Sequence, residues 1–379
     1  MPVQRLRTPI PSGPAFMQGN TAVAEALFAA GVRFFGGYPI TPASEIMYTM
    51  EQRFREGGGV FFQAEDELSA IAAVIGASWG GVRAATATSG PGFSLMVENL
   101  GYAVMTETPM VLIDVQRAGP ATGQATRPSQ SDLYQVRYGT QGDFEMIVLY
   151  PWSVQELFDL TVRAVSLSER FRTPVILLTE ESIGHLRENL VIPGEIEVFS
   201  REKGSPGQAP FAMDEAKVSR MPCFGDGENL LVTGSTHDEF GWRKTQDPDA
   251  QDRLTRHLVG KVLANRAEID DWEEYFLDDA ETCVFAAGVS ARAGLAAVKT
   301  LRSEGMKIGL IRPRTLWPFP EMSDELSRFG TVFVPEMNTG KLRLEVERQT
   351  GAQVIGINKL NARVITPTEI REAITSRMA

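Results

Sequence analysis

Apolar and polar positions alternate along the first half of the chain in two rhythms. Short, continuous apolar runs are separated by longer stretches of helical character, several of them rich in alanine. The expected strands are Val32–Phe35, Val60–Phe62, Ala84–Thr88, Met110–Val115, Glu145–Tyr150 and Pro174–Leu178, and the expected helices lie near residues 20–30, 43–55, 65–79, 93–105 and 153–170. Continuous apolar strands alternating with helices predict a parallel sheet covered on both faces, with ligand-binding loops at the carboxyl ends of its strands.

This alternation breaks off near residue 190 and resumes near residue 280. Ser200–Pro210 and Lys244–Arg253 are polar and contain glycine or proline, so we expect loops there. Asp270–Glu281 holds seven carboxylates and is expected to be a solvated face or a connector. Further strands are expected at Thr282–Ala287, Lys307–Ile311, Thr331–Val334 and Val354–Ile357, with helices near 291–304, 321–328, 341–350 and 367–377.

The pattern divides the chain into three parts. We expect an α/β domain over residues 1–190, a connector over 191–275 and a smaller α/β domain over 276–379. A length of 379 residues is sufficient for two or three domains that each bury a core.

Composition narrows the classes of function. The net charge of -11 argues against nucleic acid as a partner, because phosphate binding needs clustered lysine and arginine. Two cysteines cannot ligate a four-iron cluster alone, and so few fit a reducing compartment. Residues 1–14 have no apolar core and no run of 18 apolar residues occurs, so we expect neither a signal peptide nor a membrane span, but a cytoplasmic protein.

The first candidate site is the turn Gly36–Ser44, which directly follows an expected strand. Its glycines permit unusual backbone angles and its prolines stiffen the chain, so Thr41, next to Pro42, is held rigidly at the carboxyl end of a strand. An ordinary loop in which Ser44 caps the next helix explains the same residues equally well.

The second candidate is Gln63–Gly76, where three acids open a helix that is small and apolar on nearly every face. Such a helix is expected to be buried. The acids suit the helix dipole, but three of them crowd one turn, so at least one is expected to point inward, where a ligand nitrogen would stabilise its charge. Periodicity does not choose among Glu65, Asp66 and Glu67.

Two further segments follow strands and consist mainly of small residues. In Thr86–Gly92 a glycine-rich turn opens a helix and lets the backbone approach a ligand, although a plain strand-to-helix turn has the same pattern and the lysine of a P-loop is missing. In Val115–Asp132, Arg117 comes directly after a strand, where a guanidinium can clamp a substrate carboxylate. Arg127 is expected to be a surface residue.

In this order and spacing, the four segments resemble the 2-oxoacid:ferredoxin oxidoreductase family, and the resemblance covers nearly the whole chain. The motifs that carry it are Gln18-Gly-Asn20, Tyr38-Pro-Ile-Thr-Pro42, Ala64-Glu-Asp-Glu67, Thr88-Ser-Gly-Pro-Gly92, Gly119-Pro, Thr122-Gly123, Arg312-Pro, Trp317-Pro-Phe-Pro320 and Pro335-Glu-Met-Asn338. The resemblance implies a thiamine-diphosphate pyrimidine-binding domain, which is a doubly wound parallel sheet, followed by a smaller transketolase C-terminal-like α/β domain.

The resemblance also implies roles for individual residues. In thiamine enzymes a glutamate of the pyrimidine-binding domain hydrogen-bonds the aminopyrimidine ring and drives ylide formation, and this catalytic role carries over to Glu67, the last acid of its motif. The family's substrate-binding threonine and arginine match Thr41 and Arg117. The cofactor-binding residues are then expected to be Pro39, Ile40, Glu67, Ser89 and Gly90, and no metal ligand is expected in this chain.

The implied reaction is the CoA-acylating oxidative decarboxylation of a 2-oxoacid, with electrons passing to ferredoxin. Thiamine diphosphate would be shared with a beta-type subunit that holds Mg²⁺ and a [4Fe-4S] cluster, and separate gamma and ferredoxin-like delta subunits are expected. The GYPITPAS and AEDE segments are most similar to the 2-oxoglutarate branch, which forms succinyl-CoA. A distal substrate carboxylate would need a cation from Arg117, the second domain or the partner.

Departures from the family pattern and alternative functions remain open. Relatives often have Ser-Ser where this chain has Ala43-Ser44, and Asn-x-Gly-Gln where it has Asn338-Thr-Gly-Lys341. The same scaffold acting on branched-chain or aryl 2-oxoacids is the nearest alternative, and a non-catalytic scaffold subunit is another. A non-oxidative thiamine decarboxylase or synthase would need a Mg-diphosphate motif in its own chain.

Two other patterns lack the context of a site. Gly225–Gly227 has the letters of a Mg-diphosphate motif, but the apolar run Leu230–Thr233 follows it instead of preceding it, so we expect a turn. His185, His237 and His257 are scattered, so neither a metal site nor a Ser-His pairing is expected. His237 is expected to be structural or exposed.

Overall fold

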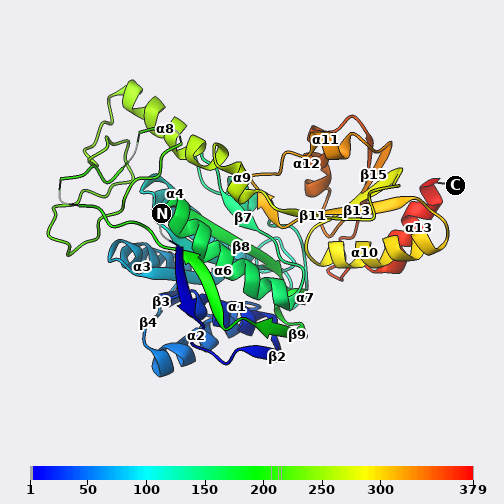
Figure 1. Ribbon diagram of the computed structural model, residues 1–379, viewed down its shortest axis with the longest axis horizontal. Coiled ribbons are helices and arrows are strands. Elements are labelled where there is room, and N and C mark those ends of the chain that lie inside the picture. Colours follow the sequence, from blue (N-terminus) through cyan, green and yellow to red (C-terminus); the bar gives the residue numbers. More distant parts are fainter. Residues whose placement is uncertain (1–2, 206, 212, 215, 379) are drawn as a thin grey trace.

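The computed structural model of the protein, which describes residues 3–205, 207–211, 213–214 and 216–378, contains two large sheets (Figure 1). A seven-stranded sheet lies in the middle of the molecule, and a five-stranded sheet lies at one end of its long axis. The described residues between 200 and 245 form loops that extend at the other end. No helix of the described part of the chain has the length and apolar character that crossing a bilayer requires.

The seven-stranded sheet is parallel except at one edge. Its order is β14-β7-β8-β6-β5-β3-β4, and only β14 pairs antiparallel with its neighbour. The strands are β3 Val32–Gly37, β4 Val60–Gln63, β5 Arg83–Thr88, β6 Met110–Gln116, β7 Ile147–Leu149, β8 Pro174–Glu180 and β14 Thr315–Trp317. The six strands expected from the apolar runs are confirmed, whereas β14 joins from far downstream in the sequence.

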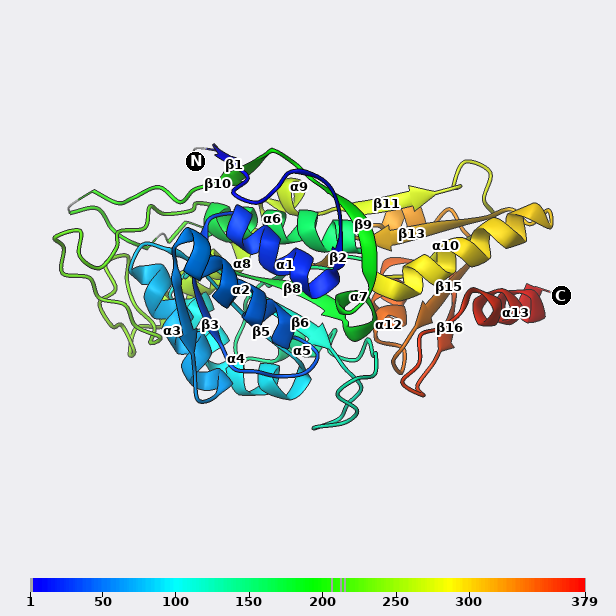
Figure 2. The ribbon, with the colours of Figure 1, turned by 90° about the horizontal axis from the view of Figure 1, so that it is seen from below.

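Helices cover both faces of this sheet (Figure 2). Alternate strand residues point to opposite sides and pack against one helix layer or the other. In β6, Val111 and Ile113 belong to one apolar core, whereas Met110 and Leu112 belong to the other. The first core includes residues of α1 Gly19–Ala29, α2 Ser44–Gly57 and α6 Val154–Phe171, and the second includes residues of α3 Glu67–Trp79 and α4 Gly90–Met105. The doubly wound arrangement predicted from the sequence is therefore confirmed.

The five-stranded sheet has the order β11-β13-β12-β15-β16, with β11 antiparallel at the edge. Its strands are β11 Trp272–Tyr275, β12 Thr282–Phe285, β13 Ile308–Pro313, β15 Thr331–Glu336 and β16 Gln353–Asn358, and its helices are α10 Gly288–Ser303, α11 Ser323–Leu326, α12 Lys341–Gln349 and α13 Pro367–Met378. Thr366 and Glu369 exchange side-chain-to-backbone hydrogen bonds of 2.8 and 3.3 Å at the start of α13. This capping box confirms the predicted start of the last helix.

The region between the sheets contains more regular structure than its polar sequence predicts. Its elements are β9 Arg187–Ile192, β10 Glu195–Phe199, α8 Pro248–Leu263 and α9 Arg266–Ile269. The remaining short elements of the chain are β1 Val3–Arg7, β2 Gly13–Gln18, α5 Gln135–Tyr138 and α7 Glu181–Gly184. Strand β1 pairs with β10, and β2 pairs with β9. The prediction of a loop over Lys244–Arg253 is wrong from residue 248 onward, where α8 begins. Asp247 is an N-cap that accepts from Asp249 N and Ala250 N at 3.0 Å, followed by a proline at the first helical position.

The acidic stretch Asp270–Glu281 is not simply a solvated face. Asp271 pairs with Arg163 and with Arg314, and Glu273 lies 2.9 Å from Arg312. These pairs tie the edge strand β11 and the residues before it to α6 of the first domain and to β13 of the second sheet. The arginines come from positions remote in sequence, so the charge run alone could not predict them.

A buried ion cluster fixes α8 on the first domain. Glu107 Oε2 accepts from Lys261 Nζ at 2.7 Å and lies 2.9 Å from His257 Nε2. All three side chains are almost fully buried. Burial raises the pKa of Glu107, but the Lys261 ammonium and His257 lower it more, so the carboxylate stays ionised. His237 is also buried, which makes it a structural residue.

We predict that Lys261→Met lowers the free energy of unfolding by about 3–5 kcal/mol, because it leaves the buried Glu107 carboxylate without its ammonium partner. Urea denaturation followed by circular dichroism measures this change. Lys299→Met, on the exposed side of α10, is the matched control and should shift stability by less than about 0.5 kcal/mol. Equal unfolding midpoints for the two variants contradict the prediction.

Candidate functional site

The predicted site residues follow the carboxyl ends of β3, β4, β5 and β6, and the loop after β6 contacts the second domain. The turn after β3 is held by the first helix: buried Asn20 donates from Nδ2 to Pro42 O at 2.7 Å and to Glu45 Oε2 at 3.0 Å. This leaves Thr41 exposed at the tip of the turn. The turn is thus rigid, as the prolines and glycines predict.

Tyr38 is also exposed, whereas the other residues of this turn are half-buried or buried. Pro39 and Ile40 are half-buried, and Ile40 O accepts from Ala43 N at 2.8 Å. Ser44 is the first residue of α2, and Ala43 before it is the N-cap without a side-chain hydrogen bond. The alternative in which Ser44 caps the helix is therefore wrong.

The three acids before and in α3 have different environments. Glu65 is exposed, and Asp66 is the N-cap of α3, where its Oδ1 accepts from Ser69 N at 2.8 Å. Glu67, the first residue of the helix, is only 4% exposed. The structure thus makes the choice among these acids that periodicity leaves open.

Glu67 lies against the turn after β5. A Cβ on Gly92 would approach Glu67 Oε1 to 2.4 Å and Thr88 Oγ1 to 2.2 Å, so only glycine fits beside this carboxyl group. Burial raises the pKa of Glu67 and nearby Asp66 raises it further, while its own backbone N–H and the charge of Arg117 oppose the shift. The carboxyl group therefore holds a proton more tightly than an ordinary glutamate does.

The outer face of α3 is uncovered in the single chain, so the burial expected on every face is wrong. Leu68 is 42% exposed, and Ala72 and Gly76, four and eight residues later, are also exposed. On the neighbouring α4, Leu95 is 45% exposed, and Asn99 Nδ2 donates to Leu68 O at 3.3 Å. An apolar patch of Leu68, Ala72 and Leu95 thus flanks the helix that begins with Glu67.

The end of β5 and the residue after it contain buried side-chain hydroxyls that lack partners. Thr86 Oγ1, Thr88 Oγ1 and Ser89 Oγ have no hydrogen-bond partner among the residues that the structure describes. Ser89 precedes α4, and Gly90 begins it. Because buried polar groups are nearly always hydrogen-bonded, unpartnered hydroxyls next to Glu67 mark a place for a polar ligand.

Arg117 joins the turn after β3 to the loop after β6. Its Nη1 donates to Thr41 O at 2.6 Å, and its side chain is buried with Nε lacking a partner within the described residues. Burial lowers the pKa of Arg117, and the charges of Asp132, Glu67 and Asp114 raise it. The predicted Thr41 and Arg117 are thus in contact, whereas Arg127 is exposed as predicted.

Two acids beside Arg117, the buried Asp114 and the half-buried Asp132, are missing from the site predicted by sequence. Asp132 Oδ2 has no hydrogen-bond partner in the described part of the chain, and for Asp114 only the backbone N–H of Gly90 and the charge of Arg117 oppose the effect of burial on its pKa. Burial, and then the neighbouring Asp132, raise the pKa of Asp114 well above its usual range, and burial raises the pKa of Asp132 to about 6. In the sequence, Asp114 could have been found as the one acid inside the apolar run Met110–Val115.

A buried amide joins the two domains at this edge. The side chain of Gln130 has five hydrogen-bond partners: the two hydrogens of its Nε2 are shared among Tyr150 OH (3.0 Å), Glu180 Oε1 (2.7 Å) and Ala287 O (3.0 Å), and its Oε1 accepts from Ser290 Oγ (2.7 Å) and Met337 N (3.1 Å). The first two partners belong to the first sheet and the last three to the second domain. The loop after β6 is therefore fixed between both domains.

A second amide extends this network to the site. Gln116 Nε2 donates to Tyr150 OH at 3.1 Å, and Gln116 Oε1 accepts from Asp132 N at 3.0 Å. Gln116 immediately precedes Arg117, so the network positions both Arg117 and Asp132. Neither Gln116 nor Gln130 is distinguished by local sequence.

A cavity of about 610 Å³ opens beside Arg117. It is lined by the start of α4 with Gly90, the loop with Arg117 and Asp132, and Lys341 at the start of α12. Of the predicted site residues, only Gly90 and Arg117 line it. Glu67, Thr41, Pro39, Ile40 and Ser89 are not among its lining residues, although Thr41 is hydrogen-bonded to Arg117 and Ser89 directly precedes Gly90.

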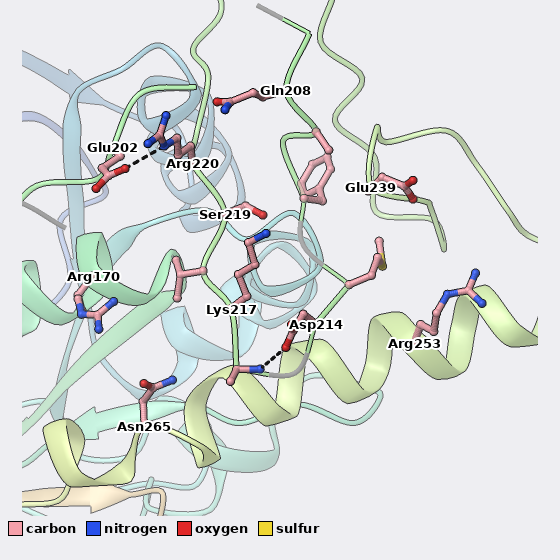
Figure 3. Close-up of a pocket in the computed structure, with 15 residues that line it drawn as sticks. Arg170, Glu202, Gln208, Asp214, Lys217, Ser219, Arg220, Glu239, Arg253 and Asn265 are labelled. Atoms are coloured by element: carbon pink, nitrogen blue, oxygen red, sulfur yellow. Dashed lines mark hydrogen bonds and ion pairs between the residues drawn. The ribbon is translucent and has the colours of Figure 1, made fainter. Parts of the chain in front are cut away.

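A larger hollow of about 930 Å³ lies elsewhere, among the loops between β10 and α8 (Figure 3). Its labelled side chains include Lys217 and Arg253, which are exposed, and Arg220, which pairs with Glu202. It contains no residue of the predicted site. The nearby Gly225–Gly227 is a turn, as predicted, in which Asp226 Oδ2 accepts from Cys223 N.

Comparison with protein families matches two parts of the chain. Residues 25–256 match the family described as pyruvate flavodoxin/ferredoxin oxidoreductase, thiamine diP-bdg. Residues 280–370 match pyruvate:ferredoxin oxidoreductase core domain II. The two matches correspond to the parts of the chain that contain the two large sheets.

Individual relatives are similar over nearly the whole chain. The 2-oxoglutarate synthase subunit KorA of Methanothermobacter marburgensis is 47% identical over 366 residues, covering 95% of this chain and 98% of that protein. The ketoisovalerate oxidoreductase subunit VorB of Methanothermobacter thermautotrophicus is 35% identical, covering 94% of this chain and 96% of that one. A solved structure of 2-oxoglutarate:ferredoxin oxidoreductase from Magnetococcus marinus, with 2-oxoglutarate, coenzyme A and succinyl-CoA bound, has a TM-score of 0.92 and 30% identity, covering 97% of this chain and 66% of that one.

We predict that Glu180 makes stability fall as pH rises from about 4.5 to about 7. Burial raises the pKa of Glu180 to about 7, so between these pH values the folded chain holds a proton that the unfolded chain has released. The loss of stability across this range is about 3 kcal/mol. Urea denaturation at several pH values should show that Glu180→Gln removes this part of the pH dependence. The exposed variant Glu65→Gln should retain it, and identical pH slopes in wild type and Glu180→Gln contradict the prediction.

Proposed function

The chain belongs to the 2-oxoacid:ferredoxin oxidoreductase family as an alpha-type subunit, and on this basis we propose that it supplies the pyrimidine-binding half of a thiamine-diphosphate site that a beta-type subunit completes. The complex carries out the CoA-acylating oxidative decarboxylation of 2-oxoglutarate to succinyl-CoA, with electrons passing to ferredoxin. The observation that carries the proposal is the buried carboxyl group of Glu67 against Gly92. The similarity to 2-oxoglutarate synthase subunits supports the choice of substrate.

The residues present fit thiamine diphosphate. Glu67 is buried, and its raised pKa suits a group that exchanges a proton with a ring nitrogen. The unpartnered hydroxyls of Thr88 and Ser89 offer hydrogen bonds to a polar ring edge. Pro39 and Ile40, half-buried in the rigid turn after β3, offer apolar contact.

Thiamine diphosphate, when bound, would supply a nucleophilic carbon for the 2-oxo group. Glu67 would hold and return a proton at its carboxyl oxygen. Arg117 binds the carboxylate next to the 2-oxo group, since its guanidinium is buried and one of its nitrogens lacks a partner in the described residues. Thr41, whose carbonyl oxygen already accepts from Arg117, contributes its hydroxyl group to the same substrate.

The beta-type partner is proposed to cover the exposed face of α3. Leu68, Ala72 and Leu95 form an apolar patch next to Glu67, and such patches on one chain mark interaction sites. A partner docked there would exclude water from the site and would bring the rest of the cofactor site to Glu67. Mg²⁺ and the [4Fe-4S] cluster are proposed to belong to that partner, because two cysteines cannot ligate a four-iron cluster.

Further partners and the cellular location follow from the same assignment. We propose a cytoplasmic complex that includes gamma-type and ferredoxin-like delta subunits, transfers electrons to ferredoxin and uses coenzyme A as co-substrate.

The domain division is proposed as 1–190, 191–275 and 276–379, with β14 as a strand that the last domain adds to the first sheet.

Branched-chain 2-oxoacids are the second candidate substrates, which the VorB relative favours. Turnover of the purified complex with each acid distinguishes them.

We predict that Glu67→Gln and Glu67→Ala each reduce turnover of the assembled complex by at least about 100-fold, because both remove the proton relay. Steady-state CoA acylation measures the loss. Glu65→Gln, two residues away and exposed, is the matched control and should leave turnover unchanged. Full activity of Glu67→Ala in a correctly assembled complex would instead favour a non-catalytic scaffold subunit.

We also predict that Leu68→Glu weakens binding to the beta-type partner by at least about 100-fold, because a carboxylate would be buried against an apolar surface. Titration of one purified subunit with the other measures the affinity. Leu263 at the end of α8 is exposed to a similar extent, and Leu263→Glu should bind the partner normally. Unchanged affinity of the Leu68→Glu variant rules out this docking face.

A further inference from the structure

The cavity beside Arg117 is lined by charged residues from both domains. Arg117 and Asp132 come from the loop after β6, and Lys341 is the first residue of α12 in the second domain. With Asp132 ionised, these three charged lining residues sum to one positive charge. The cavity therefore attracts anions, and it holds two separate cations to bind them.

The backbone of Lys341 is fixed by Asn338. Asn338 Oδ1 accepts from Gly340 N at 2.8 Å and from Lys341 N at 2.9 Å, and its Nδ2 donates to Gln130 O at 2.7 Å. Gly340 has φ +108°, which favours glycine. These bonds hold the start of α12 over the loop after β6, where Lys341 Nζ donates to Ser131 O.

Both cations keep hydrogen-bonding capacity for a ligand. An ammonium group has three donors, and the hydrogen bond to Ser131 O uses one of those of Lys341. The guanidinium of Arg117 has five donors and uses one on Thr41 O. A ligand with an anionic group at each end can engage both side chains at once.

Building on the function proposed above, we propose that Lys341 binds the distal carboxylate of a dicarboxylic 2-oxoacid whose other carboxylate is held by Arg117. A dicarboxylate gains a charge-assisted hydrogen bond that a monocarboxylic acid cannot make. A monocarboxylic acid of similar length would also place an apolar tail against the ammonium group and desolvate it without compensation. Lys341 thus selects the substrate by attraction and by rejection.

The test compares 2-oxoglutarate with 2-oxobutyrate in the complete complex at saturating coenzyme A. Lys341→Met keeps the length of the side chain and removes its charge, so we expect kcat/KM for 2-oxoglutarate to fall at least about 10-fold, mainly through KM. For 2-oxobutyrate, kcat/KM should stay the same or rise. Lys341→Arg keeps the charge and should retain most of the 2-oxoglutarate activity.

Lys299→Met, on α10, removes a lysine charge at an exposed position away from the cavity and should leave both values unchanged. If the wild-type complex turns over branched-chain acids and not 2-oxoglutarate, the proposed function itself is wrong. If it turns over 2-oxoglutarate but Lys341→Met reduces both substrates equally, the role of Lys341 is structural and this inference fails. A rise in KM for coenzyme A alone overturns it as well, since Lys341 would then bind a phosphate of that co-substrate.

Discussion

The buried side chain of Gln130 is the constraint on which the site depends, because both domains satisfy its hydrogen bonds. Tyr150 and Glu180 of the first sheet accept from its amide nitrogen, and Ser290 and Met337 of the second domain donate to its oxygen. Each such bond contributes only about 1 kcal/mol, whereas an unsatisfied buried partner costs about 1–3 kcal/mol. The main effect of the network is therefore to fix the relative placement of the two domains. Its net contribution to stability is small.

This placement determines the geometry of the site. The loop that contains Gln130 also contains Asp132, and Gln116, hydrogen-bonded to the backbone of Asp132, immediately precedes Arg117. Because the second domain holds the loop, Lys341 lines the same cavity as Arg117. A site with cations from both domains exists only when the two sheets are docked in this way.

The same edge of the first sheet leaves polar and apolar groups without partners. The hydroxyls of Thr88 and Ser89 are buried without hydrogen bonds in the described residues, and Leu68 exposes an apolar side chain next to Glu67. A folded chain rarely retains both kinds of unfavourable surface at one place. Their coincidence is consistent with half of an active site, whose other half belongs to a cofactor and a second subunit.

The sequence by itself determined six of the seven strands of the first sheet, the turns after β3 and β5, and the family, because these depend on apolar runs, prolines and glycines within a few residues of one another. It left open which acid before α3 is buried, until its resemblance to the family pointed to Glu67. It missed β14, the start of α8 and the ion pairs of Asp270–Glu281, whose partners lie far away in sequence. Tertiary structure alone decided that Gln130 meets Ala287, 157 positions later, and that Lys341 lies in the cavity with Arg117, since docking of the domains brings these residues together and no local pattern encodes it.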